Sequence, residues 1–216
     1  ASVLFRWAVT FSDKIITVSE FSRSEILTYF KSLSKKIKVI YNSLPVLNTE
    51  FSDSLIKACL DKYNLRPPYI LYVGNIKPHK NLKVFFELCQ YFNKYRSSFQ
   101  FVLVGKWKDL KTKDLDFLSR KNELENLLFL DNILDSELKI IYKEAEMLIF
   151  PSLYEGFGLP PMEAIHTNTK VVCSDIPVLR EIYQDCVYFF NPVDVNDLIQ
   201  KVNRCLKDSI NQTAYT

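Results

Sequence analysis

The sequence is poor in several features whose scarcity excludes classes of protein. Only four glycines and two histidines occur among the 216 residues. Charged residues interrupt every apolar run before it reaches the roughly 18 to 20 residues that a transmembrane helix needs. The 28 basic and 25 acidic residues nearly balance, so the chain lacks the concentrated positive charge of a dedicated nucleic-acid-binding protein. We therefore expect a globular protein with no membrane-spanning helix and no nucleic acid among its partners.

The start of the chain and its cysteines suggest a reducing compartment. Residues 1–7 have neither the basic segment nor the long apolar segment of a secretory signal, so we expect a cytoplasmic location. The five cysteines are odd in number and widely spaced, and no C-x-x-C pair occurs. We predict reduced core thiols rather than disulfides or zinc ligands. They are Cys59, Cys89, Cys173, Cys186 and Cys205.

Short apolar runs alternate with longer amphipathic segments along the chain. Several short runs are almost wholly apolar, which is typical of parallel strands buried on both faces. Residues 81–95 and 195–207 have the pattern of helices with one buried face. The alternation predicts an α/β fold with a doubly wound parallel sheet. The expected strands are residues 15–18, 38–41, 70–73, 101–104, 127–130, 148–150, 171–173 and 187–190.

The periodic pattern breaks around residues 42–51, between an expected strand and a helix that starts near Ser54. Six expected strands follow the break, which is enough for a complete open sheet, whereas only two precede it. Two parallel strands cannot bury both of their faces by themselves. We therefore divide the chain into residues 1–45, which look like the end of a larger domain, and residues 46–216, a complete domain.

The segment from Phe150 to Ile165 joins a buried strand, a glycine-containing loop and the start of a helix. Pro160 and Pro161 suit the first positions of that helix. Free backbone N–H groups and the positive end of the helix dipole form an anion site in such a place, as they do at phosphate sites of parallel sheets. We expect this loop to bind a phosphate.

Two carboxylates, Glu155 and Glu163, lie on either side of this loop. Because carboxylates repel phosphate, we interpret them as acceptors of hydrogen bonds from ribose and sugar hydroxyls. The combination of an anion site with carboxylates suits a nucleotide-sugar. The alternative is that Glu163 only caps a helix and that Glu155 is an ordinary solvated side chain.

A second loop, residues 74–81, also follows a buried strand. It carries Lys77, His79 and Lys80 to the same edge of the expected sheet. A lysine there can neutralise a diphosphate as a point charge. Basic loops are usually just solvated, so this interpretation depends on the convergence of the two loops on one crevice.

Several motifs, taken in order, resemble family 4 glycosyltransferases, the retaining GT-B enzymes. The E-x7-E signature of that family is matched by Glu155 and Glu163, and the resemblance runs from about Asp13 to Lys207. It implies that residues 46–216 form the Rossmann-like C-terminal half of a GT-B fold. The matching motifs are Tyr72-Val73-Gly74-x5-Lys80-Asn81-Leu82, Leu103-Val104-Gly105, Phe150-Pro151-Ser152-x2-Glu155-Gly156-Phe157-Gly158-Leu159-Pro160-x2-Glu163-Ala164 and Val171-Val172-Cys173-Ser174.

The resemblance also implies roles for the matching residues. Glu155 would contact hydroxyls of the transferred sugar near the developing oxocarbenium charge, and Lys80 would hold the diphosphate; these are the predicted catalytic residues. Glu163 would accept hydrogen bonds from the ribose hydroxyls. Asn75 stands where the family often has arginine, which leaves Lys80 to meet the phosphates. The other predicted donor-binding residues are Gly74, Asn75, Gly156, Phe157, Gly158 and Leu159.

The function implied by the resemblance is transfer of a hexose or deoxyhexose, with mannose among the candidates. The donor would be a UDP- or GDP-sugar, no metal or other cofactor is expected, and configuration would be retained. The acceptor would be a glycan or lipid-linked chain in polysaccharide or lipopolysaccharide biosynthesis, with the full-length enzyme peripheral to the inner face of the membrane. This chain is expected to bind the donor but, lacking most of the acceptor domain, to transfer little.

Two other hypotheses remain open. The chain could be a non-catalytic nucleotide-binding regulatory module derived from such an enzyme. It could also be an α/β scaffold without a ligand, which would require Lys80, Glu155, Glu163 and all four glycines to be incidental.

Overall fold

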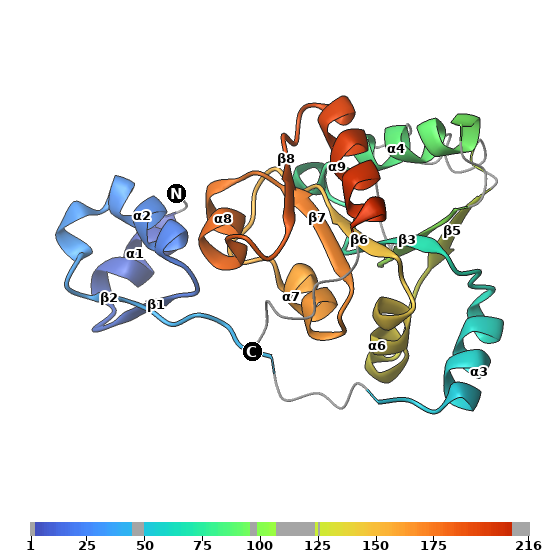
Figure 1. Ribbon diagram of the computed structural model, residues 1–216. Helices are drawn as coiled ribbons and strands as arrows, with labels where there is room; N and C mark the ends of the chain where they lie inside the picture. Colours follow the sequence, from blue (N-terminus) through green and yellow to red (C-terminus); the bar gives the residue numbers. More distant parts are fainter. Residues whose placement is uncertain (1–2, 45–49, 96–98, 107–123, 125, 209–216) are drawn as a thin grey trace.

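The computed structural model describes residues 3–44, 50–95, 99–106, 124 and 126–208, which form two parallel sheets flanked by helices (Figure 1). In chain order the elements are α1 (Val3–Phe11), β1 (Ile15–Thr17), α2 (Glu20–Tyr29), η1 (Lys31–Leu33), β2 (Ile37–Val39), α3 (Asp53–Tyr63), β3 (Tyr69–Val73), η2 (Pro78–Lys80), α4 (Leu82–Tyr95), β4 (Gln100–Val104), β5 (Leu127–Leu130), α6 (Asp135–Lys143), β6 (Met147–Phe150), α7 (Leu159–His166), β7 (Lys170–Ser174), α8 (Pro177–Tyr183), β8 (Tyr188–Phe190) and α9 (Val195–Lys207).

The larger sheet has six parallel strands in the order β5-β4-β3-β6-β7-β8. The chain runs outward from β3 to β5, returns to place β6 beside β3, and then runs outward in the other direction. The ladder between β3 and β6 ends at Leu71 and Leu148, before either strand ends. Ligands of doubly wound sheets bind at such a switch point, at the carboxyl ends of the strands. The prediction of an α/β, doubly wound parallel sheet is confirmed.

Helices cover both faces of this sheet, which explains why its strands are apolar on both sides. In β3, Ile70 and Tyr72 belong to one core cluster, and Tyr69 and Leu71 belong to the other. The first cluster lies under α4 and α9, and the second lies under α3, α6, α7 and α8. Because alternate residues face opposite sides of a strand, burying both sides requires a continuous apolar run.

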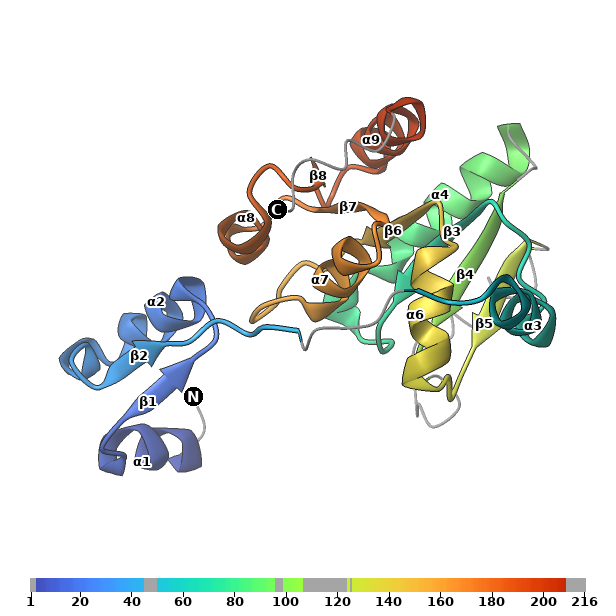
Figure 2. The same cartoon turned by 60° about the horizontal axis from the view of Figure 1, so that its bottom comes forward.

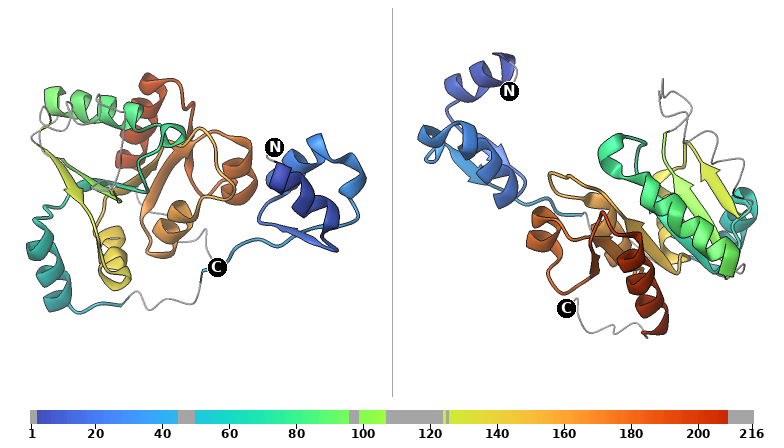
Figure 3. Two further views of the ribbon diagram at one scale, coloured as in Figure 1. Left: turned by 180° about the vertical axis from the view of Figure 1, so that it is seen from behind. Right: turned by 90° about the horizontal axis from the view of Figure 1, so that it is seen from above.

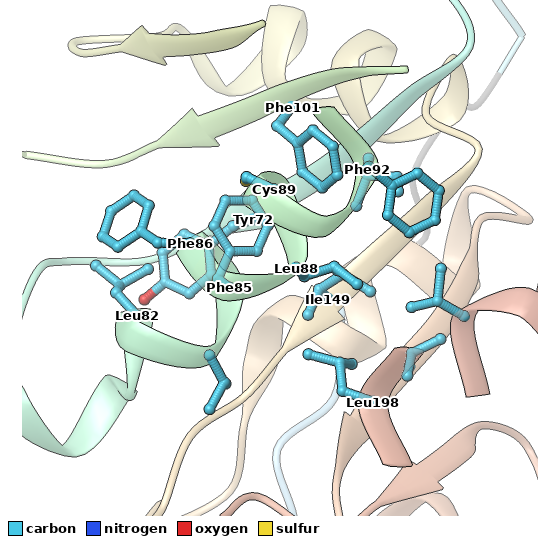
Figure 4. Packing of buried hydrophobic residues seen from close by; sticks show 14 of the residues in the cluster. Tyr72, Leu82, Phe85, Phe86, Leu88, Cys89, Phe92, Phe101, Ile149 and Leu198 are labelled. Carbon is cyan, nitrogen blue, oxygen red and sulfur yellow. The ribbon is translucent and has the colours of Figure 1, made fainter. Parts of the chain in front are cut away.

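Aromatic rings fill the core beneath α4 (Figure 4). The Phe101 ring centroid of β4 lies 5.8 Å from those of Phe85 and Phe92 on α4, and the pairs meet edge to face. Such pairs contribute about 0.5–1.5 kcal/mol beyond the apolar area that they bury. The helix stripe predicted for residues 81–95 therefore points into this core.

The smaller sheet, β1 and β2, lies with α1 and α2 beside the α8 end of the larger sheet (Figures 2 and 3). Among the described residues of this part, its core cluster contains three buried apolar side chains, those of Val9, Leu33 and Ile37. Trp7 and Phe11 of α1 remain 64% and 69% exposed. This part of the chain therefore buries little apolar surface of its own. The sequence predicted this, because two parallel strands cannot bury both of their faces by themselves.

A carboxylate of α8 fixes the start of α2. Glu181 accepts hydrogen bonds from the N–H groups of Glu20 and Phe21, at 2.6 and 2.8 Å. A negative charge at this end of a helix is favoured by the helix dipole. The Tyr41 hydroxyl also donates to Glu181, at 2.9 Å, and this hydrogen bond raises the pKa of Tyr41. Three donors from residues 20–41 thus meet at one side chain of the larger unit.

Most predicted elements are found close to their expected positions. The strand at residues 127–130 and the helix at residues 195–207 coincide with β5 and α9. The prediction placed the second strand at residues 38–41, whereas β2 spans Ile37–Val39. Four cysteines, Cys59, Cys89, Cys173 and Cys205, are buried as predicted, whereas Cys186 is half-buried. The predicted boundary between residues 1–45 and 46–216 falls at residues 45–49, outside the described residues, and stays a prediction.

Gly105 provides a test of how the ends of β3 and β4 fit together. A Cβ atom at Gly105 would lie 2.0 Å from the carbonyl oxygen of Gly74, a backbone atom that cannot move away cheaply. We expect Gly105→Ala to lower the free energy of unfolding by about 1–3 kcal/mol or more, measured by denaturant titration. The control is Gly156→Ala, because a Cβ there would meet its nearest side-chain atom only at 3.8 Å. Equal stability of the two variants would contradict the close approach.

Candidate active site

The candidate site lies where the loops after β3 and β6 meet, at the switch point of the larger sheet. Two hydrogen bonds to backbone carbonyls join these loops: the N–H of Leu153 donates to the carbonyl of His79 at 2.8 Å, and the Asn81 side chain donates to the carbonyl of Pro151 at 3.1 Å. These bonds bring the two loops together, as predicted, whereas the crevice between them stays a prediction.

Asn81 holds a third loop as well, a role that the sequence analysis missed. Its amide nitrogen lies 2.8 Å from the carbonyl of Pro192, which follows β8. Its backbone adopts φ of 54°, in the left-handed region that asparagine tolerates better than most residues. The sequence feature that could have indicated this role is the position of Asn81 between Lys80 and the apolar helix that follows. Asn81 ties the loops after β3, β6 and β8 together.

Lys80 and Glu155 form an ion pair across the two loops. The Lys80 Nζ and Glu155 Oε1 atoms are 2.5 Å apart, and the two side chains are only 13% and 12% exposed. The Lys80 Nζ also lies 5.4 Å from the centroid of the Phe150 ring. The alternative in which Glu155 is an ordinary solvated side chain is therefore wrong. An ammonium group has three N–H donors, so one bond to Glu155 leaves donors for an anionic ligand.

Glu163 lies in the middle of α7 and is held from α6. The Tyr142 hydroxyl donates to its Oε2 atom at 2.7 Å. Burial, followed by the charge of Glu163, raises the pKa of Tyr142, so the phenol stays protonated and remains a donor. The helix N-cap is Gly158, not Glu163, so the alternative in which Glu163 only caps the helix is also wrong. One oxygen of Glu163 is fixed, which leaves its other oxygen to accept from a ligand.

The start of α7 is shaped around Gly158. This residue has φ of 90°, and a Cβ atom there would lie 2.8 Å from Leu179 Cδ2. The Tyr183 hydroxyl donates to the Gly158 carbonyl. Burial is the main cause that raises the pKa of Tyr183. The helix begins at Leu159, one residue before the prolines that were predicted to open it.

The other predicted donor-binding residues differ in what they offer. The N–H of Gly74 is already bonded to Val104 at 2.9 Å, so Gly74 offers no free donor. The side chain of Asn75 is exposed beside it. The N–H groups of Phe157, Gly158 and Leu159 have no hydrogen-bond partner among the described residues. These three N–H groups are the free donors that the predicted anion site needs.

Two further findings concern only the described part of the chain. Within residues 3–44, 50–95, 99–106, 124 and 126–208, no three His, Cys, Asp or Glu side chains are grouped so that they could hold a metal ion. Over the same residues, no helix combines the length and apolar character required to cross a bilayer.

The sequence also matches a family model. The model for glycosyl transferases, group 1, covers residues 61–216, which include Lys80, Glu155 and Glu163. The chain belongs to the glycosyl transferases group 1 family. Its membership agrees with the resemblance found from the motifs.

Relatives within the family include two named mannosyltransferases. The chain is 34% identical to the O-antigen chain mannosyltransferase RfbU of Salmonella typhimurium, over 89% of this chain and 52% of the relative. It is 30% identical to the O-antigen chain mannosyltransferase B of Escherichia coli, over 90% of this chain and 51% of the relative. The chain therefore spans about half the length of these curated relatives.

Solved structures support the fold of this group 1 family member. Anabaena Alr3699/HepE, solved in complex with UDP-glucose, superimposes with a TM-score of 0.77 at 19% identity, over 94% of this chain and 57% of that one. A glycosyltransferase from Rickettsia africae gives 0.75 at 21% identity, over 89% of this chain and 53% of that one. At these identities the likeness shows the fold alone, and it confirms the predicted Rossmann-like architecture of a GT-B half.

The bond between Tyr142 and Glu163 predicts a measurable coupling. Since a hydrogen bond to a charged acceptor is worth about 1.5–3 kcal/mol, Tyr142→Phe should lower the free energy of unfolding by that amount. In a Glu163→Gln background the same substitution should cost clearly less. The control is Tyr69→Phe, which removes a 2.6 Å bond to the neutral carbonyl of Ile141 and should not couple to Glu163. Additive effects of Tyr142→Phe and Glu163→Gln in denaturant titrations would contradict the assignment.

Proposed function

We propose that this chain is the donor-binding part of a retaining hexosyltransferase that acts in O-antigen or related polysaccharide biosynthesis. Membership of the glycosyl transferases group 1 family supports the reaction class. The names of the relatives at 34% and 30% identity favour mannose as the transferred sugar. The observation that carries the proposal is the pairing of Lys80 with Glu155 beside the three free N–H groups that begin at Phe157.

In this proposal Lys80 binds the donor diphosphate and Glu155 faces the transferred sugar. Departure of the nucleoside diphosphate builds negative charge on its oxygens and positive charge on the sugar ring. A lysine and free N–H groups stabilise the negative charge on the diphosphate, and a carboxylate stabilises the positive charge on the sugar ring. Because both charges grow as the bond breaks, these groups stabilise the transition state more than the ground state. The contact between Lys80 and Glu155 keeps the two groups next to each other, as bond cleavage between sugar and phosphate requires.

Glu163 completes the donor site in this proposal by accepting from the ribose. The two ribose hydroxyls can donate to the carboxylate oxygen of Glu163 that does not accept from Tyr142. The donor is a UDP- or GDP-sugar, and the diphosphate charge is met by Lys80 and N–H groups without a metal or other cofactor. The Anabaena structure of the same fold was solved in complex with UDP-glucose, which supports a nucleotide-sugar as the ligand class.

The proposed acceptor is a glycan or a lipid-linked chain. Such an acceptor would bring the whole enzyme to the inner face of the membrane as a peripheral protein in the cytoplasm. The named relatives act on an O-antigen chain, according to their names, which supports a glycan acceptor.

Calorimetric titration of the chain tests the donor site. GDP, UDP, GDP-mannose and UDP-glucose are titrated into the wild type and into Glu163→Ala. Because each hydrogen bond to a charged partner is worth about 1.5–3 kcal/mol, loss of the ribose contacts should weaken binding roughly tenfold or more. The control is Glu87→Ala, which removes a carboxylate on the surface of α4. A folded wild type that binds none of these compounds at millimolar concentration would overturn the proposal.

A second experiment concerns transfer. We propose that the 216-residue chain binds the donor but transfers little sugar, because named relatives with this activity are about twice as long as the region that the chain matches. Release of nucleoside diphosphate is measured with a lipid-linked glycan as acceptor, with and without the chain. Robust release that depends on the acceptor would refute the description of this chain as mainly the donor-binding part.

A further inference from the structure

The loop that carries Glu155 is in contact with α2 on both sides of that residue. On one side, the Tyr154 ring lies 5.9 Å from the ring of Phe21, centroid to centroid, in an edge-on arrangement. Burial, then the charge of Glu25 and a hydrogen bond to it, raises the pKa of Tyr154. Residues of α2 therefore hold the side chain that immediately precedes Glu155.

On the other side, two serines converge on the carbonyl of Gly156. The Ser19 hydroxyl donates to this oxygen at 2.8 Å, and the Ser22 hydroxyl donates to it at 3.3 Å. A carbonyl oxygen has two lone pairs, so it can accept both bonds. Ser19 is fully buried, and as the N-cap of α2 its oxygen also accepts from the N–H of Ser22 at 3.0 Å. The two hydroxyls are therefore held in place before they meet the loop.

Two serine hydroxyls hold the carbonyl of Gly156, whereas little packs against its Cα. A Cβ atom built there would find only Ser22 Oγ at 3.8 Å and Val18 Cγ2 at 4.0 Å. A small side chain would therefore fit at Gly156, so packing against its Cα does not hold this residue. The carbonyl of Gly156 and the N–H of Phe157 belong to one planar peptide unit and point in opposite directions. Holding the oxygen against α2 therefore aims the N–H of Phe157 away from α2.

We propose that Ser19 and Ser22 are positioning residues for the donor sugar. Their hydroxyls fix the peptide between Gly156 and Phe157, so that the free N–H of Phe157 and the adjacent carboxylate of Glu155 face the sugar, while the N–H groups of Gly158 and Leu159 face the diphosphate. Hydrogen bonds accepted by the carbonyl also polarise the peptide and make its N–H a better donor. The inference rests on the proposed function, because it assigns α2 a part in the same donor site.

The site therefore includes residues from both sheets of the molecule. Glu181 of α8 keeps the start of α2 in place through its bonds to Glu20 and Phe21, so the serines stay within reach of the loop. Specificity for the sugar would depend on residues far earlier in the sequence than the E-x7-E signature.

The test compares the affinities of a nucleotide-sugar and of the matching nucleoside diphosphate. GDP-mannose with GDP, and UDP-glucose with UDP, are titrated calorimetrically into the wild type, Ser22→Ala and Ser19→Ala/Ser22→Ala. Loss of one or two oriented hydrogen-bond contacts to the sugar end should weaken binding of the preferred nucleotide-sugar about tenfold. Binding of the nucleoside diphosphate should weaken less than about threefold, because Lys80, Glu163 and the N–H groups of Gly158 and Leu159 are untouched. A purely structural role of the serines would weaken both ligands equally.

Two controls separate positioning from folding. Ser22→Ala keeps the N-cap of α2, so it remains informative if the double variant fails to fold. Ser24→Ala removes a hydroxyl from the same helix that, among the described residues, donates to the carbonyl of Phe21 alone, at 2.7 Å. This variant should bind both ligands like the wild type. Thermal unfolding of each variant checks that it is folded at the titration temperature.

The possible outcomes are distinct. A selective loss of nucleotide-sugar affinity in the serine variants, absent in Ser24→Ala, supports the inference. Equal losses for both ligands, no loss in folded Ser22→Ala, or a wild type that binds the nucleotide-sugar no better than the nucleoside diphosphate overturns the inference alone. A wild type that binds neither class overturns the proposed function and the inference with it.

Discussion

The ion pair between Lys80 and Glu155 is the contact on which the arrangement of the site depends. It joins the loops that follow β3 and β6, the two strands that are adjacent in the sheet but separated by two strands in the sequence. Both side chains are largely shielded from water, so an unpaired charge at either position would be costly. The pair therefore keeps one positive and one negative charge at a fixed place on the carboxyl edge of the sheet. A ligand with anionic and hydroxyl groups can bind there to Lys80 and Glu155 in place of their bond to each other.

Much of the fold could be predicted because its sheet is buried on both faces. Strands such as β3 and β6 leave an almost uninterrupted apolar signal, and the helices between them carry clear stripes. The loops that hold the site were found for the same reason, since each follows such a strand. The end of β2 was placed less well because its apolar run continues to Tyr41 although pairing stops at Val39. Propensity alone does not say where a strand loses its partner.

What the sequence could not reveal was which side chains support the site residues. Tyr142, Tyr183 and Asn81 act through hydrogen bonds to residues that are distant along the chain. Each resembles an ordinary core or loop residue when only its neighbours in sequence are known. Ser19 and Ser22 lie more than a hundred residues before Gly156, and their spacing reads simply as the start of a helix. Local sequence patterns identify the charged and polar residues of a site, whereas the contacts that orient those residues exist only in the folded chain.

The short helix α8 contacts both the part of the chain that holds the smaller sheet and the candidate site on the larger sheet. Its Glu181 holds the first turn of α2, and two residues later its Tyr183 braces the first turn of α7 through Gly158. A displacement of α8 would therefore alter both contacts at once. If α8 moves as a rigid body, a ligand that favours one position of the start of α7 also favours the matching position of α2, and by reciprocity whatever holds α2 changes the affinity for that ligand. A helix of seven residues thus links the two units thermodynamically.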